Sequence, residues 1–327
     1  MLGKYYINIR NKRLAYNLEF KRSVTIIRGN SGIGKSMFIK MLKDYIDLGK
    51  VSNIKVNTNI SKLFVLSSNR DCETVVNDNL QDYIFFADEN ISDVKSKYFV
   101  DYLKSSGSWL VYVTRSESTE YLQYSIDEIY SLKSSNKGTY FLNTFYKIYN
   151  DETKNIVPDI VITEDSKSGF DIISHILNCN VDTSTGKDNM VNKIKEYKAK
   201  GFKNIYIIVD GAAYGNQIAK TLVEGLNCNI YISAKESFEY LVLGYKYFSK
   251  FLTSELTDTY NFADSKLYFT WEQYYTKLLS DLCLNNYNCT YSKESWNKLN
   301  NIFKSITFLS YVQEQLSDLD DLVKIKL

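Results

Sequence analysis

The sequence predicts an α/β fold in two parts, followed by a helical C-terminal region. A short apolar strand at 23–28 runs into a glycine-rich loop and then into residues with helical spacing at 36–46. Three later segments repeat the order of apolar strand, acidic residue and helix. From about residue 246 onward, apolar residues recur at spacings of three and four. We therefore expect domains at 1–150 and 151–245, with a helical region at 246–327.

The bulk composition indicates a globular chain. Its 327 residues are enough for two domains, each with its own core. Apolar residues make up 44% and charged residues 24%, which is not the composition of a disordered chain. The net charge of +2 excludes a strong overall basic field. No apolar run approaches the ~20 residues that span a bilayer, so we expect a cytoplasmic protein without a membrane partner.

Cysteine and histidine are too sparse for the common metal and disulfide frameworks. The five cysteines include no C-x-x-C pair, and their odd number is typical of a reducing compartment. The single histidine, His175, lies in the apolar helical run DIISHIL, where we expect a structural role. A Ser-His-Asp mechanism would depend on this one residue, so catalysis of that kind is not expected.

The glycine-rich loop has the spacing of a P-loop. GNSGIGKS matches G-x-x-x-x-G-K-[ST] at each fixed position, between a strand and a helix. We expect its backbone to face the β-phosphate, the Lys35 ammonium to reach the β- and γ-oxygens, and the Ser36 hydroxyl to bind Mg²⁺. The alternative is a glycine turn that only caps the helix. The candidate ATP-binding residues are Gly29, Asn30, Ser31, Gly32, Ile33, Gly34, Lys35 and Ser36.

A P-loop enzyme also needs a carboxylate at the end of a neighbouring buried strand. The run YIFFADE supplies Asp88 to hold Mg²⁺ and Glu89 to polarise the attacking water. A later apolar strand, SWLVYVTRS, ends in Thr114 and Arg115, and either side chain is a candidate sensor of the γ-phosphate. The alternatives are a solvated acidic turn in the first case and an exposed strand end in the second.

Acidic residues also end the strands of the second half. Glu164 and Asp210 each follow an apolar run, and Glu236 and Glu239 follow a third. Because the carboxyl ends of parallel strands meet at one edge of a sheet, these carboxylates are candidate ligands for Mg²⁺ or Mn²⁺. Phosphodiester cleavage is a common use of such a cluster. The alternative is that they are acids of ordinary turns.

A lysine-rich stretch lies between the first two of these strands. Lys187 begins it after a glycine, where a helix N-terminus would favour phosphate. The stretch continues with four more lysines, which suit either a nucleic-acid contact or a solvated helix surface: Lys193, Lys195, Lys198 and Lys200.

Residues 1–145 resemble the ABC-type ATPases, including the DNA-repair and defence branch. The likeness lies in the N-terminal strand pair, the P-loop, the strand that ends in Asp88 and Glu89, and the strand that ends in Thr114. The LSGGQ-like signature of that family has no match before the Asp-Glu strand, where LSSN at 66–69 is a poor substitute. The resemblance therefore does not extend to ATP-driven dimer closure.

Residues 157–245 resemble the TOPRIM domain, most closely that of OLD-family (overcoming lysogenisation defect) nucleases, which join an ABC-type ATPase to a C-terminal TOPRIM domain. Glu164 matches the first motif, Gly186–Asn189 the G-K-x-N step, and Ser237–Leu241 the S-x-E part of the later S-x-E-x-x-[LI] setting. Asp210 matches the first acid of the D-x-D motif, but Ala212 stands where the second acid is expected. The resemblance implies metal at Glu164, Asp210 and Glu239, with Asp165 or Glu236 as substitutes for the missing acid.

Two functions follow from these motifs. The first is an ATPase coupled to a metal-dependent nuclease in bacterial or prophage defence, with DNA or RNA as substrate. Its catalytic residues are Lys35, Glu89, Glu164 and Asp210, and its cofactors are ATP and Mg²⁺, with Mn²⁺ as an option in the second half. The second is a nucleotide-dependent switch whose TOPRIM-like half is inactive and binds a protein partner or a second copy of the chain. A P-loop kinase is a third option, although no acceptor site is evident in the sequence.

Overall fold

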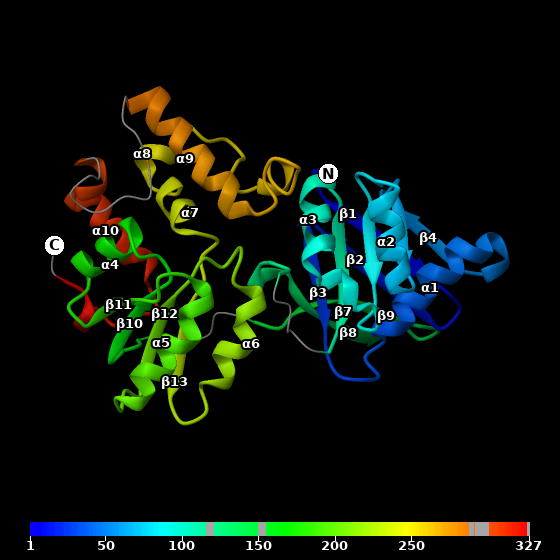
Figure 1. The fold of residues 1–327 in the computed structure, drawn as a ribbon, viewed down its shortest axis with the longest axis horizontal. Helices are drawn as coiled ribbons and strands as arrows, with labels where there is room; N and C mark the ends of the chain where they lie inside the picture. Colours follow the sequence, from blue (N-terminus) through cyan, green and yellow to red (C-terminus); the bar gives the residue numbers. More distant parts are fainter. Residues whose placement is uncertain (116–120, 150–154, 288–290, 292–300, 326–327) are drawn as a thin grey trace. The chain divides into compact units, whose positions relative to one another are not determined.

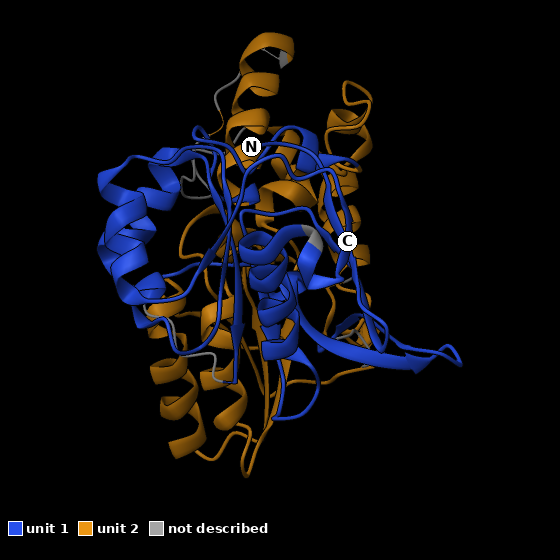
Figure 2. Cartoon of the chain, turned by 90° about the vertical axis from the view of Figure 1, so that its right-hand side faces the viewer, with its two compact units in different colours: residues 1–150, 258–271 blue, residues 151–257, 272–327 orange. Residues whose placement is uncertain are grey.

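The computed structural model describes residues 1–115, 121–149, 155–287, 291 and 301–325. The chain forms two compact units, each with its own sheet. Unit 1 consists of Met1–Asn150 with Asp258–Trp271, and unit 2 of Asp151–Thr257 with Glu272–Leu327 (Figure 2). The α/β fold is confirmed. Residues 258–271 belong to unit 1, although the sequence grouped them with the C-terminal helices.

The described residues of unit 1 form a nine-stranded sheet of order β4-β1-β2-β9-β8-β3-β7-β6-β5 (Figure 1). Neighbours from β8 to β5 run parallel, β2 is parallel to β9, and the pairs β1·β2, β1·β4 and β8·β9 are antiparallel. The strands are β1 (Tyr5–Arg10), β2 (Leu14–Phe20), β3 (Val24–Arg28), β4 (Lys55–Thr58), β5 (Leu63–Leu66), β6 (Ile84–Ala87), β7 (Trp109–Thr114), β8 (Ile129–Asn136) and β9 (Phe141–Lys147).

Two helices of unit 1, α2 and α3, begin after serines whose side chains cap them. The Ser68 side chain accepts from the Asp71 N–H and forms a capping box at the start of α2 (Asn69–Asn77), so the LSSN run is a strand end followed by a helix cap. The Ser96 side chain caps α3 (Lys97–Ser106) by accepting from the Phe99 N–H. The remaining helices are α1 (Lys35–Leu48) and the short 3₁₀ segments η1 (Gly49–Ser52), η2 (Ser92–Lys95), η3 (Ile126–Glu128) and η4 (Thr259–Asn261).

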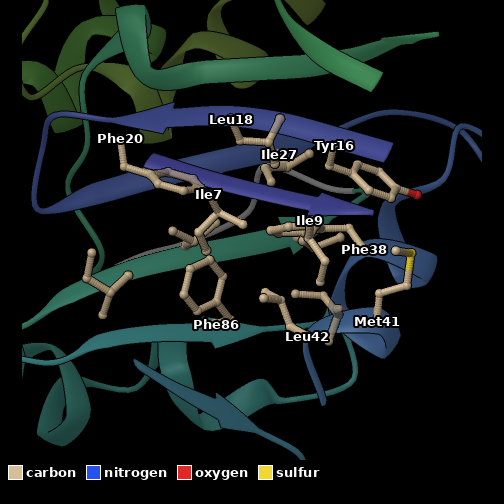
Figure 3. Close-up of a cluster of buried hydrophobic side chains, with 14 of the residues drawn as sticks. Ile7, Ile9, Tyr16, Leu18, Phe20, Ile27, Phe38, Met41, Leu42 and Phe86 are labelled. Carbon is tan, nitrogen blue, oxygen red and sulfur yellow. The ribbon is translucent and has the colours of Figure 1, made fainter. Parts of the chain in front are cut away.

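The core of unit 1 explains why its sheet curls. The Phe20 ring of β2 lies 5.8 Å from the Phe86 ring of β6, although four strands, β9, β8, β3 and β7, lie between β2 and β6 in the sheet order. Phe38 of α1 packs between these strands, 5.9 Å from Phe86 and 5.3 Å from Tyr16. Figure 3 shows Met41 and Leu42 of α1 in the same cluster. The helix that follows the glycine-rich loop therefore packs against strands that are far apart in the sheet order.

Residues 258–271, here called the returning segment, dock onto unit 1 through buried polar groups. The Arg22 guanidinium lies 3.6 Å from the centroid of a Trp271 ring, and its Nε lies 3.6 Å from Glu128 Oε1. Trp109 Nε1 donates to the Asp264 carbonyl at 3.1 Å, and Trp271 Nε1 donates to the Asp264 carboxylate. Glu128 is fully buried and Asp264 nearly so. Arg22, which lies beside Glu128 and over the Trp271 ring, and Asp264, which accepts from two tryptophans, thus join the segment to the rest of unit 1.

Unit 2 contains a four-stranded parallel sheet of order β11-β10-β12-β13 in its described residues. Its strands are β10 (Ile160–Thr163), β11 (Val181–Thr183), β12 (Asn204–Ile208) and β13 (Asn229–Ser233). The crossover helices are α4 (Ser168–Ile176), α5 (Lys187–Ala199) and α6 (Gly215–Val223). Because right-handed crossovers reverse direction after β11, α5 and α6 cover one face and α4 the other.

Unit 2 ends in a group of helices, of which α10 packs against α4 and α7. They are α7 (Phe238–Leu243), α8 (Lys246–Ser249), α9 (Trp271–Tyr287) and α10 (Ile306–Gln315), with η6 (Asn301–Lys304) and η7 (Asp321–Val323). The C-terminal tail pairs with the rest of the unit at Ile156↔Leu319 and Leu177↔Lys324. The described residues of the predicted 246–327 region contain helices joined by turns, and they share one compact unit with 151–245 apart from residues 258–271.

Candidate functional site

The glycine-rich loop of unit 1 lies between a strand and a helix, as predicted. β3 ends at Arg28, the glycine loop follows, and α1 begins at Lys35. No side chain caps the N-terminus of α1, and its Ncap residue, Gly34, has a φ of 95°. A Cβ at Gly34 would also come within 3.0 Å of the Tyr16 hydroxyl, which donates to the Gly34 carbonyl at 2.8 Å. Glycine is required there by conformation and by space, and the first N–H groups of the helix remain available to an anion.

Lys35 is bound by its own loop. Its ammonium donates to the carbonyl of Asn30 at 2.9 Å and to the carbonyl of Gly29. The residue is 6% exposed, and burial lowers the pKa of its ammonium below the usual value, while Glu89 acts in the opposite direction. A phosphate would offer Lys35 charged oxygen acceptors in place of two neutral carbonyls, and such hydrogen bonds are the stronger ones.

A pocket of about 540 Å³ opens beside this loop. One wall is a single face of β2, β9 and β8, because cross-strand partners share a face and alternate residues point the same way. The register places Leu14 opposite Phe141, and Tyr16 opposite Asn143, which is in turn opposite Ser134. This wall was not predicted from the sequence, although apolar residues alternate along β2. The wall residues are Leu14, Tyr16, Leu132, Ser134, Phe141 and Asn143.

The predicted carboxylates Asp88 and Glu89 line the same pocket, directly after β6. From the sequence we expected their strand, β6, to be the direct neighbour of β3. This expectation is wrong, since β7 lies between β3 and β6. Arg115 follows β7 and holds Glu89 through two contacts: Arg115 Nε lies 2.9 Å from Oε1, and its backbone N–H donates to Oε2 at 3.0 Å. The pocket therefore joins a lysine, an arginine, two carboxylates and the Ser36 hydroxyl.

Of the two candidate sensors, Arg115 reaches the pocket and Thr114 does not line it. Thr114 is buried at the end of β7 and pairs in register with Arg28, next to the P-loop. Val113 and Arg115 line the pocket because they point to the opposite side of the strand from Thr114. Gly29 and Asn30 also lie outside the lining residues, and their carbonyls instead accept from Lys35.

In unit 2, Glu164 and Asp210 lie side by side at the carboxyl ends of β10 and β12. The backbone N–H of Asp210 donates to Glu164 Oε2 at 3.1 Å, and Asp210 Oδ1 accepts from the Phe238 N–H at 3.1 Å. The turn after β12 runs close to the turn after β13, where a Cβ on Gly211 would lie 2.4 Å from the Ala234 carbonyl oxygen. The Glu164 carboxylate thus contacts the backbone of Asp210 at this edge of the sheet, while the metal site predicted there stays a prediction.

The other predicted metal ligands are engaged elsewhere. Glu239 is fully buried and accepts from the Tyr291 hydroxyl at 3.0 Å. Asp165 accepts from the backbone N–H groups of Lys167 and Gly169, at the start of α4. Ala212, 4% exposed, brings no carboxylate to the site. Among the residues that the structure describes, no group of three or more His, Cys, Asp or Glu side chains is arranged to hold a metal ion.

The lysines of α5 form ion pairs. Lys193 pairs with Asp182 at 2.8 Å, Lys198 with Glu224 at 3.2 Å and Lys200 with Glu196 at 2.6 Å. Lys195 lies 3.7 Å from Glu224. A helix whose cations are already neutralised offers little attraction to phosphate, so the solvated-surface interpretation of this helix fits the structure better.

Two single residues complete the predicted set. Lys187 begins α5, and its ammonium donates to the Ala213 carbonyl at 3.2 Å, which places it at the same end of the sheet as Glu164 and Asp210. His175 is exposed on α4, and its Nδ1 lies 2.7 Å from the Asp171 carbonyl oxygen of its own helix. That contact within one turn suits the structural role expected of it.

Comparisons of the chain with models of protein families, with curated proteins and with solved structures give no match. Within the described ranges, none of the helices has both the length and the apolar character needed to cross a membrane.

Proposed function

We propose that the chain binds and hydrolyses ATP in the unit 1 pocket and acts as a nucleotide-dependent switch. The observation that carries this proposal is the pocket itself, where Lys35, Ser36, Asp88, Glu89 and Arg115 line one space beside an uncapped helix N-terminus. These residue types match what phosphoryl transfer needs: cations for phosphate oxygens, oxygen ligands for Mg²⁺ and a carboxylate for water.

Each side chain has a distinct part in this proposal. Lys35 exchanges its two loop carbonyls for phosphate oxygens when nucleotide binds. Ser36 and Asp88 offer the hydroxyl and carboxylate oxygens that suit Mg²⁺, and the bound ion would neutralise phosphate charge. Glu89 orients and polarises the attacking water, and Arg115 supplies positive charge next to it. The pocket wall formed by β2, β9 and β8, with the exposed Phe141 ring, is suited to the base and sugar of the nucleotide.

The test is nucleotide binding by Lys35→Ala beside Lys40→Ala, which removes an exposed lysine from the same helix. Hydrogen bonds to charged groups contribute about 1.5–3 kcal/mol, so Lys35→Ala should weaken ATP binding by about tenfold or more. Isothermal titration with ATP and Mg²⁺ measures this directly. Equal affinities in the two variants would show that ATP does not bind at this loop.

A second candidate function is metal-dependent phosphodiester cleavage by unit 2, as in the OLD-family resemblance. The adjacency of Glu164 and Asp210 favours it, whereas the engagement of Glu239 with Tyr291 and the alanine at 212 favour the switch. Incubation with supercoiled plasmid and with RNA, in Mg²⁺ or Mn²⁺, separates the two. Cleavage that Glu164→Ala abolishes while ATP binding persists would establish the nuclease and replace the inactive-unit interpretation.

A further inference from the structure

The opposite side of the pocket wall is an exposed sheet face with an excess of positive charge. The register aligns Lys55, Arg10, Ala15, Leu142 and Ser135 across β4, β1, β2, β9 and β8. Cross-strand partners share a face, so Lys55 and Arg10 stand next to each other on it. Lys133, two residues before Ser135, points to the same side. We call this surface the open face.

Two turns extend the charge of the open face at one end. The β1–β2 turn carries Lys12 and Arg13, and the β8–β9 turn carries Lys137. The turns lie side by side because the Phe141 N–H donates to the Arg13 carbonyl at 2.8 Å. Arg10 links them further, since its guanidinium lies 3.8 Å from the centroid of the Tyr140 ring.

These six cations have no acidic partners in the described residues, in contrast to the lysines of α5. All six are exposed, and none of them forms an ion pair there. Residues 1–18 and 129–149 contain no Asp or Glu, and the nearest acid on this side of β2, Glu19, lies 3.9 Å from Lys4. A cluster of unpaired cations on a nearly neutral chain marks a surface that attracts a polyanion.

The open face also offers rings and amides. Tyr146 is 50% exposed and, by alternation along β9, lies on the same side as Leu142 and Tyr140. A second row across the sheet aligns Asn57, Asn8 and Asn17 with Thr144 and Lys133. Cations that follow a backbone, with aromatic rings on which bases stack, are the components of single-strand recognition.

We propose that the open face binds single-stranded nucleic acid. The cations contact phosphates, Tyr146 stacks on a base, and the asparagine row offers hydrogen bonds to sugars and base edges. An anionic membrane or an acidic peptide would meet the same charge, but neither would use the exposed ring and the amide row. The surface is separate from the nucleotide pocket, so the proposal does not depend on ATP hydrolysis.

The test compares two triple variants with equal charge change, using a labelled 20-nucleotide single strand without ATP. The first is Arg10→Gln, Lys12→Gln and Arg13→Gln, and the second, on α5, is Lys195→Gln, Lys198→Gln and Lys200→Gln. Each phosphate contact contributes about 0.7 to the slope of log affinity against log salt for single strands, so the first variant should lose about 2 in slope and about tenfold or more in affinity. The α5 variant should bind like the unsubstituted protein.

A ring substitution keeps the proposal testable if a turn variant fails to fold. Stacking contributes about 1–3 kcal/mol per base, so Tyr146→Ala should weaken binding by about fivefold or more, while Tyr146→Phe retains it. Lys35→Ala should bind the strand normally, which separates this proposal from the ATP site. No binding by the unsubstituted protein, equal loss in both triple variants, or preferential binding to phosphatidylserine vesicles or polyglutamate would overturn the assignment.

Discussion

Two residues that line the pocket of unit 1, Lys35 and Glu89, already have protein partners, which the proposed nucleotide would displace or join. Lys35 donates to loop carbonyls, and Glu89 is held by Arg115 through side chain and backbone. P-loop spacing predicted Lys35 from the sequence, and an apolar run that ends in two acids predicted Glu89. The Arg115 contact could not be read from the sequence, because it depends on the order of β3, β7 and β6 in the sheet.

Glu89→Gln is expected to preserve ATP binding and to lower hydrolysis by about 10²-fold or more, since glutamine cannot accept a proton from water. Glu19→Gln, on an exposed position of β2, is the matched control. Phosphate release measured at saturating ATP reports the difference. Undiminished turnover by Glu89→Gln would assign the water-activating role to another group.

Ala212→Asp is expected to destabilise unit 2 in the absence of divalent cations. The side chain at 212 is buried, and its backbone N–H donates to the Glu236 carbonyl at 3.0 Å, so the new carboxylate would lose hydration without a prepared partner. The expected cost is about 1–3 kcal/mol of unfolding free energy. Mn²⁺ should recover part of the loss, since Glu164 and Asp210 end the adjacent strands.

Thermal unfolding with and without Mn²⁺ measures this, with Ala212→Asn as the uncharged control of similar size. A melting temperature of Ala212→Asp that Mn²⁺ leaves unchanged would mean that these strand ends do not form a metal site even when the acid is restored.

At the scale of elements, long apolar runs were predicted well and short strands were not. The β1–β2 hairpin, the strand before the P-loop, and β10, β12 and β13 each appear as runs of four or more apolar or alternating residues. β4 (KVNT) and β11 (VDT) are short and only partly buried, and they exist because a partner strand offers its edge. The pocket wall could not be predicted either, because it forms only when β2, from residues 14–20, pairs with β9 and β8, from residues 129–147.

The docking of the returning segment should depend on pH. Burial raises the pKa of Glu128 to about 7 and that of Asp264 to about 6, while the nearby Arg22 acts to lower both. The ordinary pKa of such carboxyl groups is near 4. At pH values between this ordinary pKa and the raised pKa values, the folded protein binds more protons than the unfolded chain, so the free energy of unfolding falls as pH rises. The stabilisation is largest near pH 4–5 and is lost by about pH 7.

Glu128→Gln is expected to flatten this slope, because glutamine resembles the protonated acid at every pH. Thermal unfolding followed from pH 5 to 8 measures it, and Asp127→Asn, at the exposed neighbouring acid that pairs with Lys147, is the control. A slope in Glu128→Gln as steep as that of the unsubstituted protein would show that Glu128 is already ionised when buried.

At the scale of the whole molecule, the sequence predicted two α/β parts and the change of unit near residue 150. It did not predict that residues 258–271 return to unit 1. The segment has no strand of its own, and it joins unit 1 through single contacts such as Ser23 Oγ to the Phe269 carbonyl at 2.9 Å. Contacts of this kind leave no periodic pattern, so only the three-dimensional structure reveals them.

The returning segment also decides what a cut of the chain would do. The polypeptide passes from one unit to the other three times, near residues 150, 257 and 271. A single break after residue 150 would therefore yield two peptides that separate in denaturant, yet the longer peptide would still hold the shorter one through the Arg22, Glu128 and Trp271 contacts. Conversely, a gene fragment encoding only residues 1–150 would leave Glu128 and Arg22 without the tryptophan that covers them. Unit 1 is one folded body, but no single stretch of the sequence encodes it.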